Sequence, residues 1–137
     1  MPRRPPPQPG RAPDWPPEEV RAALKKQLVG LETLRDRNYR EVESEERRWR
    51  NLTLNVITHG FGDPSNNVQQ FKHADLVGRV HAPSMSEGQH QQNFHRRIEA
   101  LSATVRGIID ELELMGAMVR PEPTVAKEGL PQARRAK

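Results

Sequence analysis

Histidine is the residue type of this 137-residue chain best suited to metal binding or proton transfer, and the sequence has five: His59, His73, His81, His90 and His95. Metal ligands on a helix favour a spacing of four residues, whereas His90 and His95 are five apart and no His-Glu-x-x-His motif is present. The spacing therefore predicts no metal site and no acid-base centre, and we expect these histidines on the surface or in loops. An enzyme acting through them ranks third among the functions that the sequence allows.

Other signatures of catalysis are also missing from the sequence. The chain has no cysteine, which excludes disulfides, thiolate catalysis and cysteine-based zinc sites. It has no phosphate-binding loop, dinucleotide fingerprint or Gly-x-Ser-x-Gly elbow. The paired carboxylates Glu45 and Glu46 stand in a run balanced by arginines, which is typical of a solvated helix face. We therefore expect a non-enzymatic protein with no catalytic, cofactor-binding or metal-binding residues.

Composition limits the size of the folded core and indicates the cellular compartment of the protein. Hydrophobic residues make up 34% of the chain and charged residues 29%, so apolar burial must be concentrated in particular stretches. No apolar run approaches the ~20 residues of a membrane span, and the N-terminus lacks the hydrophobic stretch of a signal peptide. These features predict a cytoplasmic protein that does not enter a membrane.

The two ends of the chain are predicted to be disordered tails. Residues 1–17 hold eight of the thirteen prolines, and residues 119–137 follow the last helical pattern. The tails carry net charges of +2 and +3, whereas residues 18–118 carry −1. This distribution supports a second function, weak and salt-sensitive binding of nucleic acid, with phosphate contacts from Arg3, Arg4, Arg11, Lys127, Arg134, Arg135 and Lys137.

The first helical region starts at Pro16-Pro17-Glu18-Glu19, because proline and acidic residues favour the first turn of a helix. It carries two apolar stripes separated by the polar residues 35–48. The stripes are Val20, Leu24, Leu28 and Leu31, and then Val42, Trp49, Leu52 and Val56. The pattern predicts either one long helix that its partner covers only in part, or two helices hinged near Gly30 or residues 36–38.

The second half of the chain has clearer signals. The segment His59–Pro64 contains two glycines and a proline and should end the first region. Asp63 or Ser65 can cap a short helix over 65–74, with Val68, Phe71 and Leu76 turned inward. A long helix should begin at Ser84 or Ser86 with a capping box and end near Gly116 or Pro121. Its apolar residues form a heptad seam: Phe94, Ile98, Leu101, Val105, Ile108, Leu112 and Met115.

Together these elements predict an all-α fold, a long antiparallel helical hairpin over 18–118 with a short connecting helix. In this hairpin Trp49, Leu52 and Val56 meet Phe94, Ile98 and Leu101. A core of this size barely offsets the entropy of ordering the chain, so a protein partner or a second copy should complete it through the heptad seam. The residues expected in the core or the interaction seam are Trp49, Leu52, Val56, Phe61, Phe71, Phe94, Ile98, Leu101, Val105, Ile108, Leu112 and Met115.

The middle of the chain also resembles a known helical module. The residues concerned are Trp49 ahead of Leu52-Thr53-Leu54-Asn55-Val56-Ile57, then Phe61-Gly62-Asp63-Pro64-Ser65, Phe71, and a closing helix from Leu101 through Leu112. This pattern resembles the region that precedes the TIR-like domain in bacterial predicted nucleotide-binding proteins. The TIR-like domain itself is absent, so nucleotide binding is not carried over. The resemblance implies a helical sensing or assembly module in bacterial defence or stress response.

Overall fold

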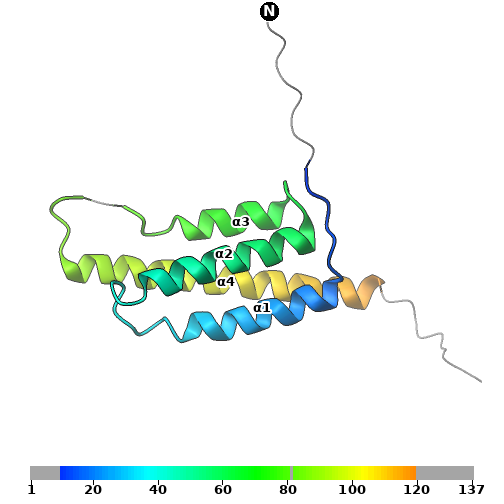
Figure 1. Ribbon diagram of the computed structural model, residues 1–137, viewed down its shortest axis with the longest axis horizontal. Coiled ribbons are helices and arrows are strands. Elements are labelled where there is room, and N and C mark those ends of the chain that lie inside the picture. Colours follow the sequence, from blue (N-terminus) through cyan, green and yellow to red (C-terminus); the bar gives the residue numbers. More distant parts are fainter. Residues whose placement is uncertain (1–9, 81, 120–137) are drawn as a thin grey trace, which may run out of the picture.

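The computed structural model describes residues 10–80 and 82–119. This part of the chain forms four α-helices, α1 (Pro17–Glu32), α2 (Glu43–Phe61), α3 (Asn66–Asp75) and α4 (Glu87–Val119) (Figure 1). The prediction of an all-α fold is confirmed. Residues 1–9 and 120–137, which make up most of the two predicted tails, lie outside the described residues. None of the described helices is long and apolar enough to cross a membrane.

The helices pack as an up-and-down bundle in which the long helix α4 packs beside α1 and α3 (Figure 1). α1 contacts α2 and α4, and α3 contacts the same two helices. Arg21 near the start of α1 pairs with Glu113 near the end of α4, so these two helices are antiparallel. Gly60 near the end of α2 lies against Val20 near the start of α1. The first arm of the predicted hairpin is therefore two antiparallel helices, the second of the two alternatives that the sequence left open.

The break between α1 and α2 spans residues 33–42 and contains the predicted hinge at 36–38. Thr33 ends α1 by donating both its backbone N–H and its hydroxyl to the carbonyl oxygen of Gly30. The Asn38 side chain then accepts a hydrogen bond from the backbone N–H of Arg40 at 2.9 Å, which favours a turn over a helix. Leu34 and Val42 are buried at the two ends of this segment and hold it on the bundle.

The turn between α2 and α3 follows the predicted chemistry. Gly62 adopts a φ of 84°, a conformation that side chains rarely allow, and Ser65 caps α3 by accepting a hydrogen bond from the Val68 N–H at 3.1 Å. Val68 and Phe71 are buried as expected. Leu76 is 63% exposed, contrary to expectation, because α3 ends at Asp75 and Leu76 already turns away from the bundle.

α4 begins with the predicted capping box. The Ser86 hydroxyl accepts from the Gln89 N–H, and the Gln89 side chain accepts from the Ser86 N–H. Gly116 does not end the helix, which continues to Val119. The seam residue Met115 is 39% exposed, near the C-terminal end of α4.

Trp49 is buried, but it packs differently from the predicted hairpin. Its indole N–H donates to the carbonyl oxygen of Gln27 in α1 at 2.6 Å, and its ring lies 6.0 Å from the ring of Phe71 in α3. Trp49 therefore joins α1, α2 and α3, whereas the predicted contact was with α4. Leu52 was expected to point inward as well, and it is 50% exposed.

Residues 10–16, the described part of the predicted N-terminal arm, lie along the end of α2 (Figure 1). The backbones of Arg11 and Asp63 exchange two hydrogen bonds, and the N–H groups of Asp14 and Trp15 both donate to the carbonyl oxygen of His59. The Trp15 ring stacks on the imidazole of His59 at 4.4 Å. The expectation that Trp15 belongs to a disordered arm is corrected by these contacts.

Candidate functional site

The structure distributes the twelve predicted core or seam residues among three environments. Phe61 packs at the edge of the core, half-buried, and Leu52 and Met115 are exposed. The remaining nine are buried: Trp49, Val56, Phe71, Phe94, Ile98, Leu101, Val105, Ile108 and Leu112. The α4 seam is thus covered by the other helices of its own chain, and a partner in this fold must use another surface.

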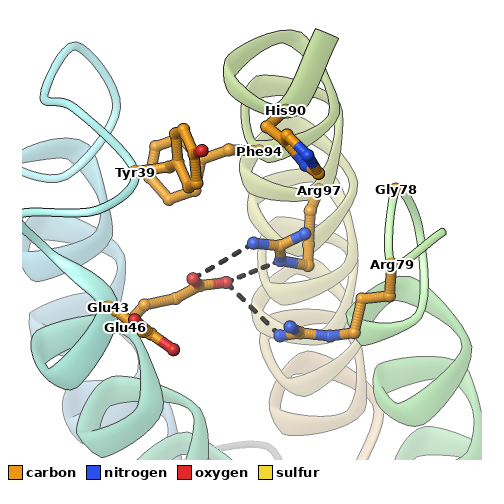
Figure 2. A pocket seen from close by; sticks show the side chains of 8 residues that line it. All are labelled: Tyr39, Glu43, Glu46, Gly78, Arg79, His90, Phe94 and Arg97. Carbon is orange, nitrogen blue, oxygen red and sulfur yellow. Dashed lines mark hydrogen bonds and ion pairs between the residues drawn. The ribbon is translucent and has the colours of Figure 1, made fainter. Parts of the chain in front are cut away.

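A polar cavity lies at one end of the bundle, where α2 and α4 begin (Figure 2). It has a volume of about 190 Å³. Its walls come from the α1–α2 connection, the first turn of α2, the loop after α3 and the first turns of α4. The lining residues are Tyr39, Glu43, Glu46, Gly78, Arg79, His90, Phe94 and Arg97.

A buried ion pair forms the base of this cavity. Arg97 donates from Nε to one carboxylate oxygen of Glu46 at 2.6 Å and from Nη2 to the other at 3.1 Å. Glu46 is 4% exposed and Arg97 7%. This two-point geometry matches the fork of a guanidinium to a carboxylate and links α2 to α4 across the bundle.

The ion pair extends into a longer network. Arg79 Nη2 lies 3.4 Å from Glu46 and 2.9 Å from Asp75, and Arg50 Nε lies 3.1 Å from the other oxygen of Asp75. Three guanidinium groups therefore share two carboxylates. Because the network connects α2, the end of α3 and α4, it fixes the loop after α3 on the bundle.

Gly78 lets this loop approach α4 closely. Its φ is 74°, and a Cβ atom at this position would lie 2.4 Å from the backbone oxygen of Asn93. The backbone can therefore form a cavity wall directly on α4.

Glu46 was expected on a solvated helix face, and this prediction is wrong, because the residue is 4% exposed. Val42, Glu46, Trp49, Thr53 and Val56 follow spacings of four and three residues, and all five are buried. The stripe inferred from apolar residues alone skipped Glu46 and Thr53 and included Leu52 instead. Extending the heptad through its polar members would have found both buried positions.

The mouth of the cavity carries a second, exposed charge cluster. The Tyr39 hydroxyl donates to a carboxylate oxygen of Glu87 at 2.5 Å, and Arg40 pairs with the same carboxylate. The hydrogen bond from Tyr39, together with Arg40, lowers the pKa of Glu87 below its ordinary value. This cluster ties the α1–α2 connection to the start of α4.

The four histidines of the described residues do not come together. His59 pairs with Asp14 through Nδ1 at 2.8 Å, His90 lines the cavity, and His73 and His95 lie on the surface. His81 lies outside the described residues. Over residues 10–80 and 82–119, no group of three or more histidine, aspartate or glutamate side chains could hold a metal ion.

An apolar groove runs along the outside of α1 and α2. One hollow of about 280 Å³ is lined by Ala22, Ala23, Lys26, Gln27, Leu52 and Val56. A second, of about 230 Å³, is lined by Gln27, Gly30, Thr33, Leu34, Glu45, Arg48, Trp49 and Leu52. The two hollows share Gln27 and Leu52, so we treat them as one feature, the α1/α2 groove.

The α1/α2 groove is lined in part by small residues and by one exposed leucine. Ala22, Ala23 and Gly30 leave room beside Leu52, which projects from α2. Lys26 on α1 and Arg48 on α2 line the groove, and neither pairs with a carboxylate of the described residues.

The basic tails of the nucleic-acid alternative are almost entirely outside the described residues. Of the seven basic residues concerned, Arg11 alone is described. Its guanidinium lies 3.1 Å from the His59 ring and 3.7 Å from Asp14, so it is engaged within the fold.

Comparisons of this chain with protein-family models, with curated proteins and with solved structures found no match. The resemblance to the helical region preceding a TIR-like domain therefore stays a prediction, and any functional assignment must come from the geometry described above.

Proposed function

We propose that this chain is a non-enzymatic protein-interaction module that binds an amphipathic helix of another protein in the α1/α2 groove. The observation that carries the proposal is the exposed Leu52 in a groove of small residues. On α1 the groove extends from Ala22 to Gly30, about 12 Å at the rise of an α-helix, and it continues past the end of α1 to Thr33 and Leu34. This length suits about three turns of a bound helix, whose apolar residues would pack around Leu52.

The charges beside the groove favour an acidic partner. Lys26 and Arg48 are unpaired cations from the two helices that form the groove, and Glu45 is neutralised by Arg37 at 3.2 Å. A helix with acidic residues flanking its apolar stripe would pair with both cations. A second copy using the same face would bring Lys26 and Arg48 against their own counterparts, which disfavours a symmetric dimer.

A synthetic peptide tests this proposal. The probe is an acidic helix of about 14 residues with leucines three and four residues apart and glutamates elsewhere. Trp49 lines the groove, so its fluorescence in a Trp15→Phe background reports occupancy directly. We expect binding to the parent chain, and roughly tenfold or greater weakening by Leu52→Asp, because the charge would be desolvated on binding.

Leu76→Asp is the matched control, because Leu76 is exposed at the end of α3, away from the groove. It should leave the affinity unchanged. A version of the peptide with lysine at each glutamate should bind worse. Equal affinity for the two peptides, or equal effects of the two aspartate substitutions, would contradict the proposed occupant.

Sedimentation velocity over a concentration series distinguishes a second copy from a different protein. The proposal expects no dimer that depends on Leu52, whereas a dimer abolished by Leu52→Asp would assign the groove to self-association. The defence or stress-response setting implied by the resemblance is a separate hypothesis, and a gene for a TIR-like or other effector next to this one would support it.

A further inference from the structure

We propose that the polar cavity is a binding site for a small organic monocarboxylate. This site is separate from the α1/α2 groove and does not depend on the proposed partner helix. The proposal rests on the net charge of the arginine–carboxylate network, on the weakly satisfied third nitrogen of Arg97 and on the aromatic wall above it.

The network that starts at the base of the cavity and extends beyond its lining to Arg50 and Asp75 has one positive charge in excess. Arg50, Arg79 and Arg97 share Glu46 and Asp75, as described above. Glu43, also in the cavity lining, lies 3.7 Å from Arg47 and is largely exposed. One guanidinium charge is therefore not matched by a carboxylate of the network, and a monoanion in the cavity would neutralise it.

The arginines also retain donors that the protein does not use well. Arg97 donates from Nε and Nη2 to Glu46. Its Nη1 lies 3.5 Å from the carbonyl oxygen of Val77, at the limit of a hydrogen bond. Figure 2 shows this third nitrogen on the side of the guanidinium that faces His90, away from Glu46. Arg97 is nine-tenths buried, so a carboxylate oxygen would satisfy a donor that water reaches poorly.

The position of the cavity favours an anion for a second reason. Glu43 and Glu46 belong to the first turn of α2, and His90 and Phe94 belong to the first two turns of α4. Both helices therefore direct the positive ends of their dipoles toward this end of the bundle. α2 has no side-chain cap, so its first backbone N–H groups are not occupied by one.

The walls select an organic carboxylate over an inorganic anion. Phe94 and Tyr39 line the cavity above Arg97, and the Arg97 guanidinium lies 5.7 Å from the centre of the Phe94 ring (Figure 2). Phe94 is 1% exposed, so the half-buried Tyr39 ring is the aromatic face open to a compact apolar body, and about 190 Å³ accommodates one of benzoate size. A phosphate dianion would bring two negative charges to one excess positive charge and would leave the Tyr39 ring uncovered.

The first test uses benzoate as the probe, with benzamide as its neutral counterpart and inorganic phosphate as the competing anion. NMR titration of the full chain follows the side-chain Nε–H signal of Arg97. Benzoate should shift this signal and bind roughly tenfold or more tightly than benzamide, because the charged oxygens meet Arg97. Equal shifts by benzoate and benzamide would overturn the proposal, and so would tighter binding of phosphate or an unmoved Arg97 signal.

The second test uses Arg79→Gln, which removes the excess charge while keeping the Glu46–Arg97 pair. Arg96→Gln is the matched control, because Arg96 neighbours Arg97 in sequence but lies exposed and hydrogen-bonds to Asn93. Benzoate affinity should fall roughly tenfold in Arg79→Gln and stay near that of the parent in Arg96→Gln. Equal losses in the two variants would show that only the general charge of the protein attracts the probe, which contradicts a built site.

Discussion

α2 borders the polar cavity and the α1/α2 groove, and it presents opposite chemistry to them. Toward the cavity it buries Glu46, which two arginines hold in place. Toward the groove it exposes Leu52, which is 50% accessible. The two residues are six positions apart. The charged one is buried and the apolar one is exposed, which is the reverse of what their chemical types favour.

The two sides of α2 therefore differ in how accurately their side chains must be placed. A buried carboxylate is tolerated only when its partners are placed accurately, so the cavity end depends on a network that joins three helices. An exposed leucine needs no partner to keep the fold stable, so the groove can remain open until another molecule covers it. The cavity end is therefore expected to be rigid and sensitive to single substitutions, and the groove to be tolerant of them.

The largest expected effect comes from Trp49→Ala, because Trp49 joins three helices beneath the groove. Removal of a buried indole should lower the free energy of unfolding by about 3–5 kcal/mol, which is most of the stability of a small domain. Circular dichroism melts against Trp15→Ala supply the control, since Trp15 is 37% exposed and stacks only on the end of α2. Equal melting temperatures would mean that Trp49 does not hold the bundle together.

Breaking the charged network should cost nearly as much. Arg97→Met leaves Glu46 buried with only Arg79 at 3.4 Å, so we expect a loss of about 3 kcal/mol. The double variant Glu46→Leu/Arg97→Met removes both charges and should return to within about 1 kcal/mol of the parent. Urea titrations of the single and double variants measure both quantities. A double variant as unstable as the single one would contradict the idea that the uncompensated charge is the cause.

Gly78→Ala tests the wall of the cavity. The added Cβ would meet the backbone oxygen of Asn93 at a φ that favours glycine, so the loop must move away from α4. We expect a loss of about 1–3 kcal/mol. Gly107→Ala in α4 is the control, because a Cβ there meets nothing within 4 Å and should stabilise the helix slightly. Similar melting curves for the two variants would argue against a close approach at Gly78.

Leu52→Asp should barely change stability, in contrast to the substitutions above. Leu52 is half-exposed, so the free energy of unfolding should stay within about 0.5 kcal/mol of the parent, even though the same substitution removes the proposed partner binding. A large loss of stability would place Leu52 in the core and remove the contrast between the two sides of α2.

The smallest expected effect is a local pH dependence at the cavity end, read from Tyr39. The pKa of Glu87 is lowered from 4.5 in the folded protein, so its interaction with Tyr39 and Arg40 is complete above that value and is lost as pH falls through the lowered pKa. Tyr39 is the single tyrosine, and its ring signals in NMR should shift over this acidic range while those of Leu52 do not. Glu87→Gln should abolish the shift of Tyr39, and its persistence would assign it to another group.

Local sequence chemistry was sufficient to predict the helices and several of their ends. The heptad spacing of α4, the Ser86–Gln89 capping box and the Ser65 cap depend on residues within a few positions of one another. Interactions between residues this close in the chain can be predicted from the sequence itself. Whether the first region was one helix or two stayed open, because residues 35–48 have helix-forming composition and no apolar stripe.

Tertiary structure alone decided which polar residues are buried and which apolar ones are not. Arg97 lies 51 residues from Glu46 in sequence, so no local pattern near Glu46 indicated that a guanidinium would compensate its charge. Leu52 was assigned to the core by residue type, yet the heptad of α2 passes through Thr53, whose hydroxyl accepts a hydrogen bond from Gln27 of α1. Residue order determined the period and the ends of the helices, because those depend on neighbours along the chain. The polar cavity and the α1/α2 groove depend on how the helices rotate against one another, and only the packed bundle sets that rotation.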